Sequence, residues 1–242
     1  DAAGNSVDGL ISTPFTVDLS TPAVNSFAPS AGQPLNTASD PLSFDLMMSE
    51  PISGLTGSDF TNAGTATGCV FTPNASAGTS FSVTVTGCSA GTVQPQLSAG
   101  SVSDGANPGP AINSPAPGTN GINFVTTPPS GTGAPTLSAI DGSLTTLGST
   151  LASSAGTWND QGDSGATTSY RWQSCTDPAD VNSCTDISGA TESTFVPTAA
   201  LNGAYLRSLA TRINAAGASI PQASAMTGPM TRGTQTISFA AL

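Results

Sequence analysis

Apolar and polar residues alternate in several short runs of this chain, and turn-forming residues separate the runs. Such runs cover residues 41–50, with apolar Leu42, Phe44, Leu46 and Met48, and residues 79–87, with apolar Phe81, Val83 and Val85. A period of two puts the apolar side chains on one face of a half-buried β-strand. No apolar pattern with a period of 3.6 persists for ten residues, so we expect an all-β chain with almost no helix.

The residues between these runs predict further strands. Residues 66–72 and 79–87 are expected to form a hairpin through the turn PNASAG, and other short strands are expected near residues 23–28, 92–98 and 120–126. A second series of short alternating segments follows residue 134. This spacing is typical of β-sandwiches.

The length of the chain and one Pro- and Gly-rich stretch predict two domains. A sandwich takes about 100 residues, and the chain has 242. The stretch TTPPSGTGAP has no apolar alternation and separates the two series of strands. We therefore place domain one at residues 23–127, a linker at 128–134 and domain two at 135–231.

A partial repeat suggests that the same modules continue beyond these domains. DAAGN at residues 1–5 is echoed by DGAN at 104–107, and FTVDLSTP at 15–22 by INFVTTPP at 122–129. Residues 1–22 are therefore expected to be the final strand of a preceding repeat. Residues 232–242 alternate at Ile237 and Phe239 and are expected to be the first strand of a following one.

Two sets of segments resemble bacterial immunoglobulin-like repeats of large cell-surface and adhesin proteins. Domain one carries the resemblance in residues 43–72 and 98–111, and domain two in the motifs SAGTW, YRWQSC, CTDISGATESTFVPT and LNGAYLRSLATRINAAG. The resemblance implies two tandem immunoglobulin-like β-sandwiches with orphan terminal strands. In domain two it implies that Trp172 is the core tryptophan of the third strand, that GAY turns into the sixth strand, and that Tyr205 forms a corner hydrogen bond.

The expected sixth strand departs from the pattern of such repeats. Leu206, Ser208 and Ala210 share one face, whereas Leu209 and Ile213 lie on the other. Either a neighbouring domain or chain covers the face of Leu209 and Ile213, or the strand carries a bulge or ordinary surface apolar residues.

The charge of the chain limits its partners and its chemistry. The net charge is −11 and there is no His and no Lys, which disfavours nucleic acid and anionic membranes. No run reaches the roughly 18 apolar residues of a membrane span. The usual proton carriers are missing, and the acidic residues that could form a glycosidase-like pair are also common turn formers, so we expect no enzyme. These residues are Asp160, Asp163, Asp177, Asp180 and Asp186.

Calcium binding is a better explanation of the carboxylates than catalysis, because calcium takes only oxygen ligands. The DAAGN turn of related adhesin repeats implies Asp1, Asn5 and Asp8 as ligands, with Asp104 and Asn107 at the repeated position. The alternative is that both segments are solvated turns.

The four cysteines are expected to form disulfides Cys69–Cys88 and Cys175–Cys184. Zinc would require four ligands where each pair supplies two, and a thioredoxin-like motif has two residues between its cysteines rather than eight. Each disulfide closes a short loop and is expected to contribute about 3 kcal/mol. Disulfides indicate an oxidising compartment, and the resemblance to surface repeats implies an extracellular location on a bacterial cell surface.

Three functions are consistent with these features. The first is a structural rod or spacer whose partners are neighbouring repeats or copies of the same chain. The second is a filament subunit in which residues 10–19 or 235–242 add to the sheet of a neighbouring chain. The third is a carbohydrate-binding module, for which Trp158 and Tyr170 are the candidate aromatic residues.

Overall fold

A computed structural model describes residues 17–116 and 121–233. Among the described residues, strands account for 44% and short 3-10 turns for 4%, and there is no α-helix. The prediction of an all-β chain is therefore confirmed.

The first unit contains strands β1 to β11 and one 3-10 turn. Their bounds are β1 Val24–Pro29, β2 Asn36–Thr37, β3 Leu42–Ser53, η1 Gly57–Asp59, β4 Phe60–Asn62, β5 Val70–Pro73, β6 Ala77–Thr86, β7 Gly91–Val93, β8 Pro95–Leu97, β9 Val102–Ser103, β10 Pro108–Gly109 and β11 Ile122–Phe124. One sheet has the order β10-β9-β3-β6-β5, with β1 also paired to β3. The orders of the other two are β2-β11-β7 and β4-β8.

The antiparallel pair β3–β6 organises this unit. Phe44 lies opposite Val83 and Leu46 opposite Phe81, and the apolar side chains predicted to point inward are buried on both strands. The hairpin of β5 with β6 also forms as predicted. Alternation along the sequence therefore becomes one apolar face of the sheet.

Aromatic rings join the sheets of the first unit. Phe27 packs against Phe44 and Phe60, and Phe60 stacks on Phe71 with ring centroids 5.7 Å apart. All four rings are buried, and aromatic pairs of this kind stabilise a core beyond the area they bury.

The second unit contains strands β12 to β21 and two 3-10 turns. Their bounds are β12 Ser130–Gly133, β13 Leu137–Ala139, β14 Leu151–Ser153, β15 Thr157–Asn159, β16 Thr167–Cys175, η2 Val181–Ser183, β17 Cys184–Asp186, β18 Thr194–Phe195, η3 Ala199–Leu201, β19 Tyr205–Asn214, β20 Gly217–Ala218 and β21 Gln222–Ala223. The sheet orders are β12-β15, β13-β14-β18 and β17-β16-β19-β20, with β21 also paired to β19.

Trp172 is the centre of the second, smaller core. It is 0% exposed, tilts against Phe195 with centroids 5.5 Å apart, and donates its indole N–H to the carbonyl of Glu192. The core role predicted for Trp172 is confirmed. Strand β19 begins at Tyr205, the last residue of the predicted GAY turn.

Strand β19 pairs with β16 without interruption from Tyr205 to Ile213. Leu206, Ser208 and Ala210 are fully buried, whereas Ile213 is 39% exposed. A bulge in this pairing therefore does not explain the outward positions of Leu209 and Ile213.

The expected corner hydrogen bond of Tyr205 is not found either. Tyr205 lies opposite Cys175 on the outer side of the sheet, and its hydroxyl has no hydrogen bond to any described residue.

Two segments differ from their sequence-based assignments. Ser130–Gly133, within the predicted linker, is strand β12 and pairs with β15. Residues 17–22, part of a predicted strand, lie in no strand, and Val17 and Leu19 are 60% and 83% exposed. Of the predicted strand 232–242, Arg232 and Gly233 are described and lie outside strands, and the rest, with Ile237 and Phe239, is outside the described residues.

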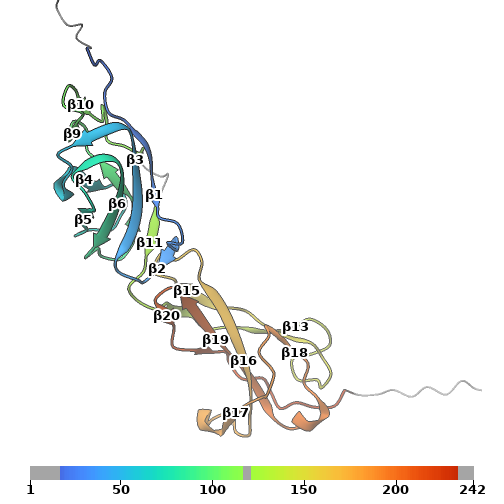
Figure 1. The fold of residues 1–242 in the computed structure, drawn as a ribbon. Coiled ribbons are helices and arrows are strands. Elements are labelled where there is room, and N and C mark those ends of the chain that lie inside the picture. The colour runs from blue at the N-terminus through green and yellow to red at the C-terminus, as the bar shows by residue number, and fades with distance from the viewer. Residues whose placement is uncertain (1–16, 117–120, 234–242) are drawn as a thin grey trace, which may run out of the picture.

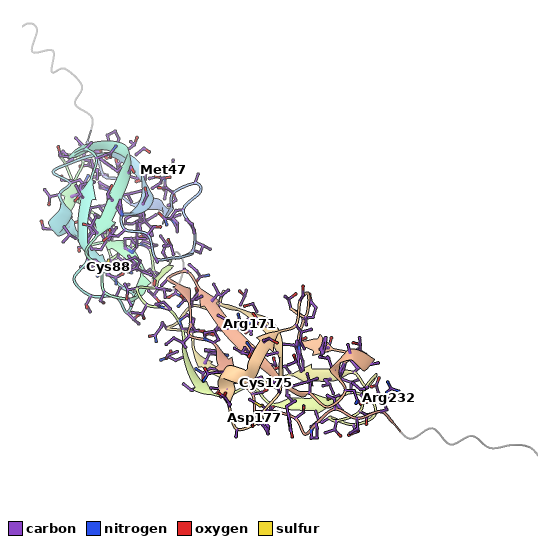
Figure 2. The ribbon with its side chains drawn as sticks, turned by 90° about the horizontal axis from the view of Figure 1, so that it is seen from below. Met47, Cys88, Arg171, Cys175, Asp177 and Arg232 are labelled. Atoms are coloured by element: carbon purple, nitrogen blue, oxygen red, sulfur yellow. A yellow bond between two sulfur atoms is a disulfide. The ribbon has the colours of Figure 1, made fainter. Side chains whose placement is uncertain are left out.

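The two units lie end to end (Figure 1), and no described sheet contains strands of both. The first and last described segments are at opposite ends of the molecule (Figure 1). In Figure 2, Met47 and Arg232 mark the two ends, while Arg171 and Cys175 lie in the second unit.

Both expected disulfides, Cys69–Cys88 and Cys175–Cys184, are confirmed.

One hydroxyl in the second core predicts a stabilising substitution. Ser208 is fully buried opposite Trp172, and its Oγ has no hydrogen-bond partner. Because an unsatisfied buried hydroxyl is costly, Ser208→Ala is expected to raise the free energy of unfolding by about 1 kcal/mol. Thermal unfolding should then shift upward by roughly 4 °C.

Ser224→Ala is the matched control for this prediction. Ser224 is also buried, but its Oγ accepts from the backbone N–H of Ser208 and donates to the carbonyl of Ala225. Its removal should lower the melting temperature. A lower melting temperature for both variants would show that the Ser208 hydroxyl is satisfied in solution.

Candidate functional site

The joint between the two units is made by polar side chains. Asn123 on β11 donates from Nδ2 to the carbonyl of Gly162 in the second unit at 2.6 Å. The same nitrogen lies 3.2 Å from Oδ1 of Asn36 in the first unit. A side-chain amide has two N–H groups and can serve both acceptors, so Asn123 links the end of one unit to a loop of the next.

The receiving loop, residues 160–166, is held by a buried carboxylate. Asp163 is 4% exposed and accepts from the N–H of Gly165 through Oδ1 and from the N–H of Ala215 through Oδ2. A Cβ at Gly165 would lie 3.0 Å from Nδ2 of Asn36, so a larger residue would crowd the joint. The loop therefore presents the Gly162 carbonyl in one defined position.

Asn214 fixes the chain that crosses the joint. Its Nδ2 donates to the carbonyl of Thr127 at 2.9 Å and lies 3.3 Å from the carbonyl of Asp160. Thr127 belongs to the segment between β11 and β12. The connecting segment and the receiving loop are thus held by one side chain.

An ion pair braces the start of this loop. Arg212 donates to both carboxylate oxygens of Asp160, at 2.8 and 2.6 Å, and to the hydroxyl of Thr168. Hydrogen bonding from Arg212 lowers the pKa of Asp160, and the same contact raises the pKa of Arg212. Bidentate pairs of this kind are directional as well as strong.

A second polar group lies at the other end of the first unit. One carboxylate oxygen from each of Asp18, Glu50 and Asp104 lies within 4.8 Å of the others. The hydroxyl of Ser20 is 2.6 Å from Oδ1 of Asp18 and 2.9 Å from Oε2 of Glu50, and it can donate its proton to one of them. These three acidic residues are called the carboxylate cluster below.

Asp104 carries the feature that suggests a cation. Its Oδ1 accepts from the N–H groups of Asn107 and Ala106, and these bonds lower the pKa of Asp104. Its Oδ2 is buried and has no hydrogen-bond partner among residues 17–116 and 121–233. An ionised oxygen without a partner, close to two other carboxylates, fits the oxygen-only ligand set of calcium.

The predicted calcium residues are thus only partly brought together. Asp104 belongs to the carboxylate cluster, and Asn107 contacts it by donating from Nδ2 to the carbonyl of Asp18. Asp1, Asn5 and Asp8 lie outside the described residues. Asp18 and Glu50 were not predicted, because nothing in their local sequence marks them as ligands.

The candidates for a glycosidase-like pair have structural partners instead. Asp160 and Asp163 belong to the joint. In the loop between the cysteines, Asp177 and Asp180 each accept from a backbone N–H two residues further on. Asp186 accepts from Gln173 and pairs with Arg171, which is half exposed.

The remaining candidate positions form no shared site among the described residues. Trp158 is half-buried on β15 and donates its indole N–H to the carbonyl of Ala155, whereas Tyr170 lies on β16, in a different sheet. Leu209 and Ile213 lie on the outer face of β19, opposite Arg171 and Thr167. One cavity of the first unit, of about 710 Å³, is lined in part by Phe60 and Phe71, and its lining contains no acidic or basic side chain.

The comparisons with known proteins leave the family of this chain open. A scan against protein-family models finds no match, and a search of curated protein sequences finds no significant one.

No helix among residues 17–116 and 121–233 has the length and apolar character needed to cross a membrane. The two disulfides are consistent with an extracellular environment.

The Asp160–Arg212 pair predicts a pH-dependent contribution to stability. Because the pKa of Asp160 is lowered by folding, its contribution is present above its ordinary pKa of about 3.9 and is lost as the pH falls through the lowered value. Asp160→Asn is expected to lower the free energy of unfolding by about 2 kcal/mol at pH 7. The difference from wild type should shrink below pH 4 in thermal or urea unfolding.

Glu192→Gln is the control for the loss of one exposed carboxylate, because the side chain of Glu192 has no hydrogen bond or ion pair to another described residue. It should change stability little at either pH. An Asp160→Asn deficit that stays constant down to pH 2 would contradict the ion-pair explanation.

Proposed function

We propose that this chain is a structural, non-enzymatic spacer in an extracellular protein of a bacterial cell surface, built from two tandem immunoglobulin-like sandwiches. The observation that carries the proposal is the joint. Asn123 bonds directly to loop 160–166 of the second unit, and Asn214 holds the segment that connects the two cores. A spacer requires a fixed direction between its units, and this arrangement supplies one.

The resemblance to repeats of large adhesin proteins supports the same proposal. So does the position of the first and last described segments at opposite ends of the molecule (Figure 1). A chain that enters at one end and leaves at the other adds length with each unit. Neighbouring repeats or copies of the chain are the partners that such a spacer requires.

The alternatives have less support. Strand donation would use residues 10–19 or 235–242, of which only 17–19 are described, and these lie in no strand. Carbohydrate binding would use Trp158 and Tyr170, which lie in different sheets and are both partly buried. Neither alternative gains a formed site from the described residues.

The rigidity of the joint tests the spacer function. Spin labels carried by non-canonical residues at Met47 and Thr185, both exposed, report the distance between the units. Pulsed electron resonance is expected to give a distribution as narrow as that between Ile140 and Thr185, two exposed positions of the second unit. Asn123→Ala should widen it, because it removes the bond to Gly162 that crosses the joint. The melting temperature of the second core should not change, whereas the first unit also loses the contact of Asn123 with Asn36.

Asn182→Ala serves as the control, since Asn182 is exposed and its side chain makes no hydrogen bond within the described part of the chain. Its distribution should match that of wild type. A wild-type distribution already as wide as that of Asn123→Ala would mean that the units are flexibly linked, and a rigid spacer would be excluded.

Calcium is part of this proposal because the carboxylate cluster lies where the chain enters the first unit. Asp18 belongs to the entering segment, Glu50 to β3 and Asp104 to the turn before β10. A calcium ion held by these three residues would tie the entering segment to the unit and neutralise their mutual repulsion.

Calcium is therefore expected to stabilise the first unit. At a calcium concentration 100 times the dissociation constant, the free energy of unfolding is expected to rise by about 2.7 kcal/mol. Thermal unfolding with calcium and with chelator would detect this difference. Asp104→Asn and Glu50→Gln should abolish the shift, whereas Glu192→Gln, remote from the cluster, should retain it. Equal melting temperatures with calcium and with chelator would contradict the assignment.

A further inference from the structure

The last strand of the first unit pairs with a strand from the beginning of the same unit. Strand β11 lies parallel to β2, with Asn123 opposite Asn36. The backbone N–H of Asn123 donates to the carbonyl of Leu35 at 2.7 Å. The N–H of Val125 donates to the carbonyl of Thr37 at 2.9 Å. Because the side chains of Asn123 and Asn36 are also linked, the pair is held at three places.

The second unit holds its last described segment in the same way. Thr231 pairs in parallel with Thr146. The N–H of Thr231 donates to the carbonyl of Thr145 at 2.7 Å, and its carbonyl accepts from the N–H of Leu147 at 2.9 Å. Residues 145–147 lie between β13 and β14, in the early part of the unit. Both units therefore join a late segment to an early one in a parallel pair.

The parallel direction determines how a pull on the chain reaches these bonds. The first and last described segments lie at opposite ends of the molecule (Figure 1), so the early segment is pulled from its N-terminal side and the late segment from its C-terminal side. In a parallel pair these two sides lie at opposite ends. The segments are then drawn past each other, and all bonds of the pair carry the load together. In an antiparallel pair the bonds would break one after another.

The two pairs differ in their exposure to water. In the first unit Thr37 and Val125 are 5% and 0% exposed. In the second unit Thr231 is exposed, and Thr145 and Leu147 are only half-buried. A hydrogen bond shielded from water is electrostatically stronger than an exposed one, and water cannot replace it while the strands shift. The pair of the first unit should therefore resist the larger force.

We infer that the two parallel pairs are mechanical clamps, and that the second unit unfolds under load before the first. The inference rests on the proposed spacer function, because a spacer transmits load between its ends. It adds to that function an order in which the two cores give way. Resistance to a pull depends on the rate of unfolding under load, so the clamps can be tested separately from the melting temperature.

Single-molecule stretching of the whole chain, tethered at its two ends, measures both clamps. Two unfolding steps are expected. The disulfides close spans of 19 and 9 residues. Reductant should therefore lengthen the step of the first unit by about 65 Å and that of the second by about 30 Å, at ~3.4 Å per residue. These lengths assign each step to its unit, and the step at the lower force should belong to the second.

A second direction of pull distinguishes a clamp from a unit that is only thermodynamically stable. A tether at Ala90, which is exposed and precedes β7, replaces the one at the N-terminal end. Gly91 of β7 lies opposite Phe124 of β11 in an antiparallel pair, so this pull unzips β11 from one end. The unfolding force of the first unit should fall several-fold, whereas that of the second unit should stay the same.

Proline substitutions remove single bonds of the clamps. Val125→Pro removes the N–H that donates to Thr37 and should lower the unfolding force of the first unit alone. Ala63→Pro is the matched control, because it removes the backbone bond to Gln94, which lies outside the clamp. It should lower the melting temperature without a comparable loss of force. Thr231→Pro should lower the force of the second unit alone, and it tests the idea even if Val125→Pro fails to fold.

The other outcomes would contradict the inference. Equal forces for the two tethers would overturn the clamp of the first unit, and the spacer function, which depends on the distance between the units, would still stand. A first unit that yields before the second would overturn the order. A wide distance distribution between the units, together with forces that depend on direction, would exclude the rigid spacer but support the clamps.

Discussion

One long antiparallel strand pair in each unit determines where every other element can lie. In the first unit it is β3–β6 and in the second β16–β19. Their inner faces supply eight of the eighteen buried residues of the first core and two of the five of the second, and the short strands pack around them. The end of the second pair also builds the joint, because Arg212 and Asn214 are the last residues of β19. The position of the joint therefore depends on where the β16–β19 pair ends.

The parts of this fold that follow from local sequence could be predicted. Alternation at Leu42, Phe44 and Leu46 is visible in ten residues, because side chains on a strand have a period of two. The disulfides follow from cysteines close in sequence, and Trp172 from a short motif around it. In each case the residues that determine the outcome are near neighbours in the chain.

The joint and the carboxylate cluster could not be predicted in this way. Asn123 donates to the backbone carbonyl of Gly162. Any residue at position 162 would provide such a carbonyl, so the sequence alone does not indicate this hydrogen bond. Asp18, Glu50 and Asp104 come from three distant segments and meet only in the folded unit. Strand β12 was missed because its residues are mostly exposed and its pairing with β15 requires no apolar alternation.

A polar joint has a physical advantage over an apolar one in a chain of repeated units. An apolar interface exposes an aggregation-prone surface whenever the units separate, whereas amides and carbonyls are readily hydrated. Each hydrogen bond contributes only about 0.5–1.5 kcal/mol net, while burying one large apolar side chain contributes about 1.5–3 kcal/mol. The few bonds of the joint are therefore weaker together than either core. If the chain is the proposed spacer, its units would separate under load before they unfold, and directed hydrogen bonds would restore the original orientation.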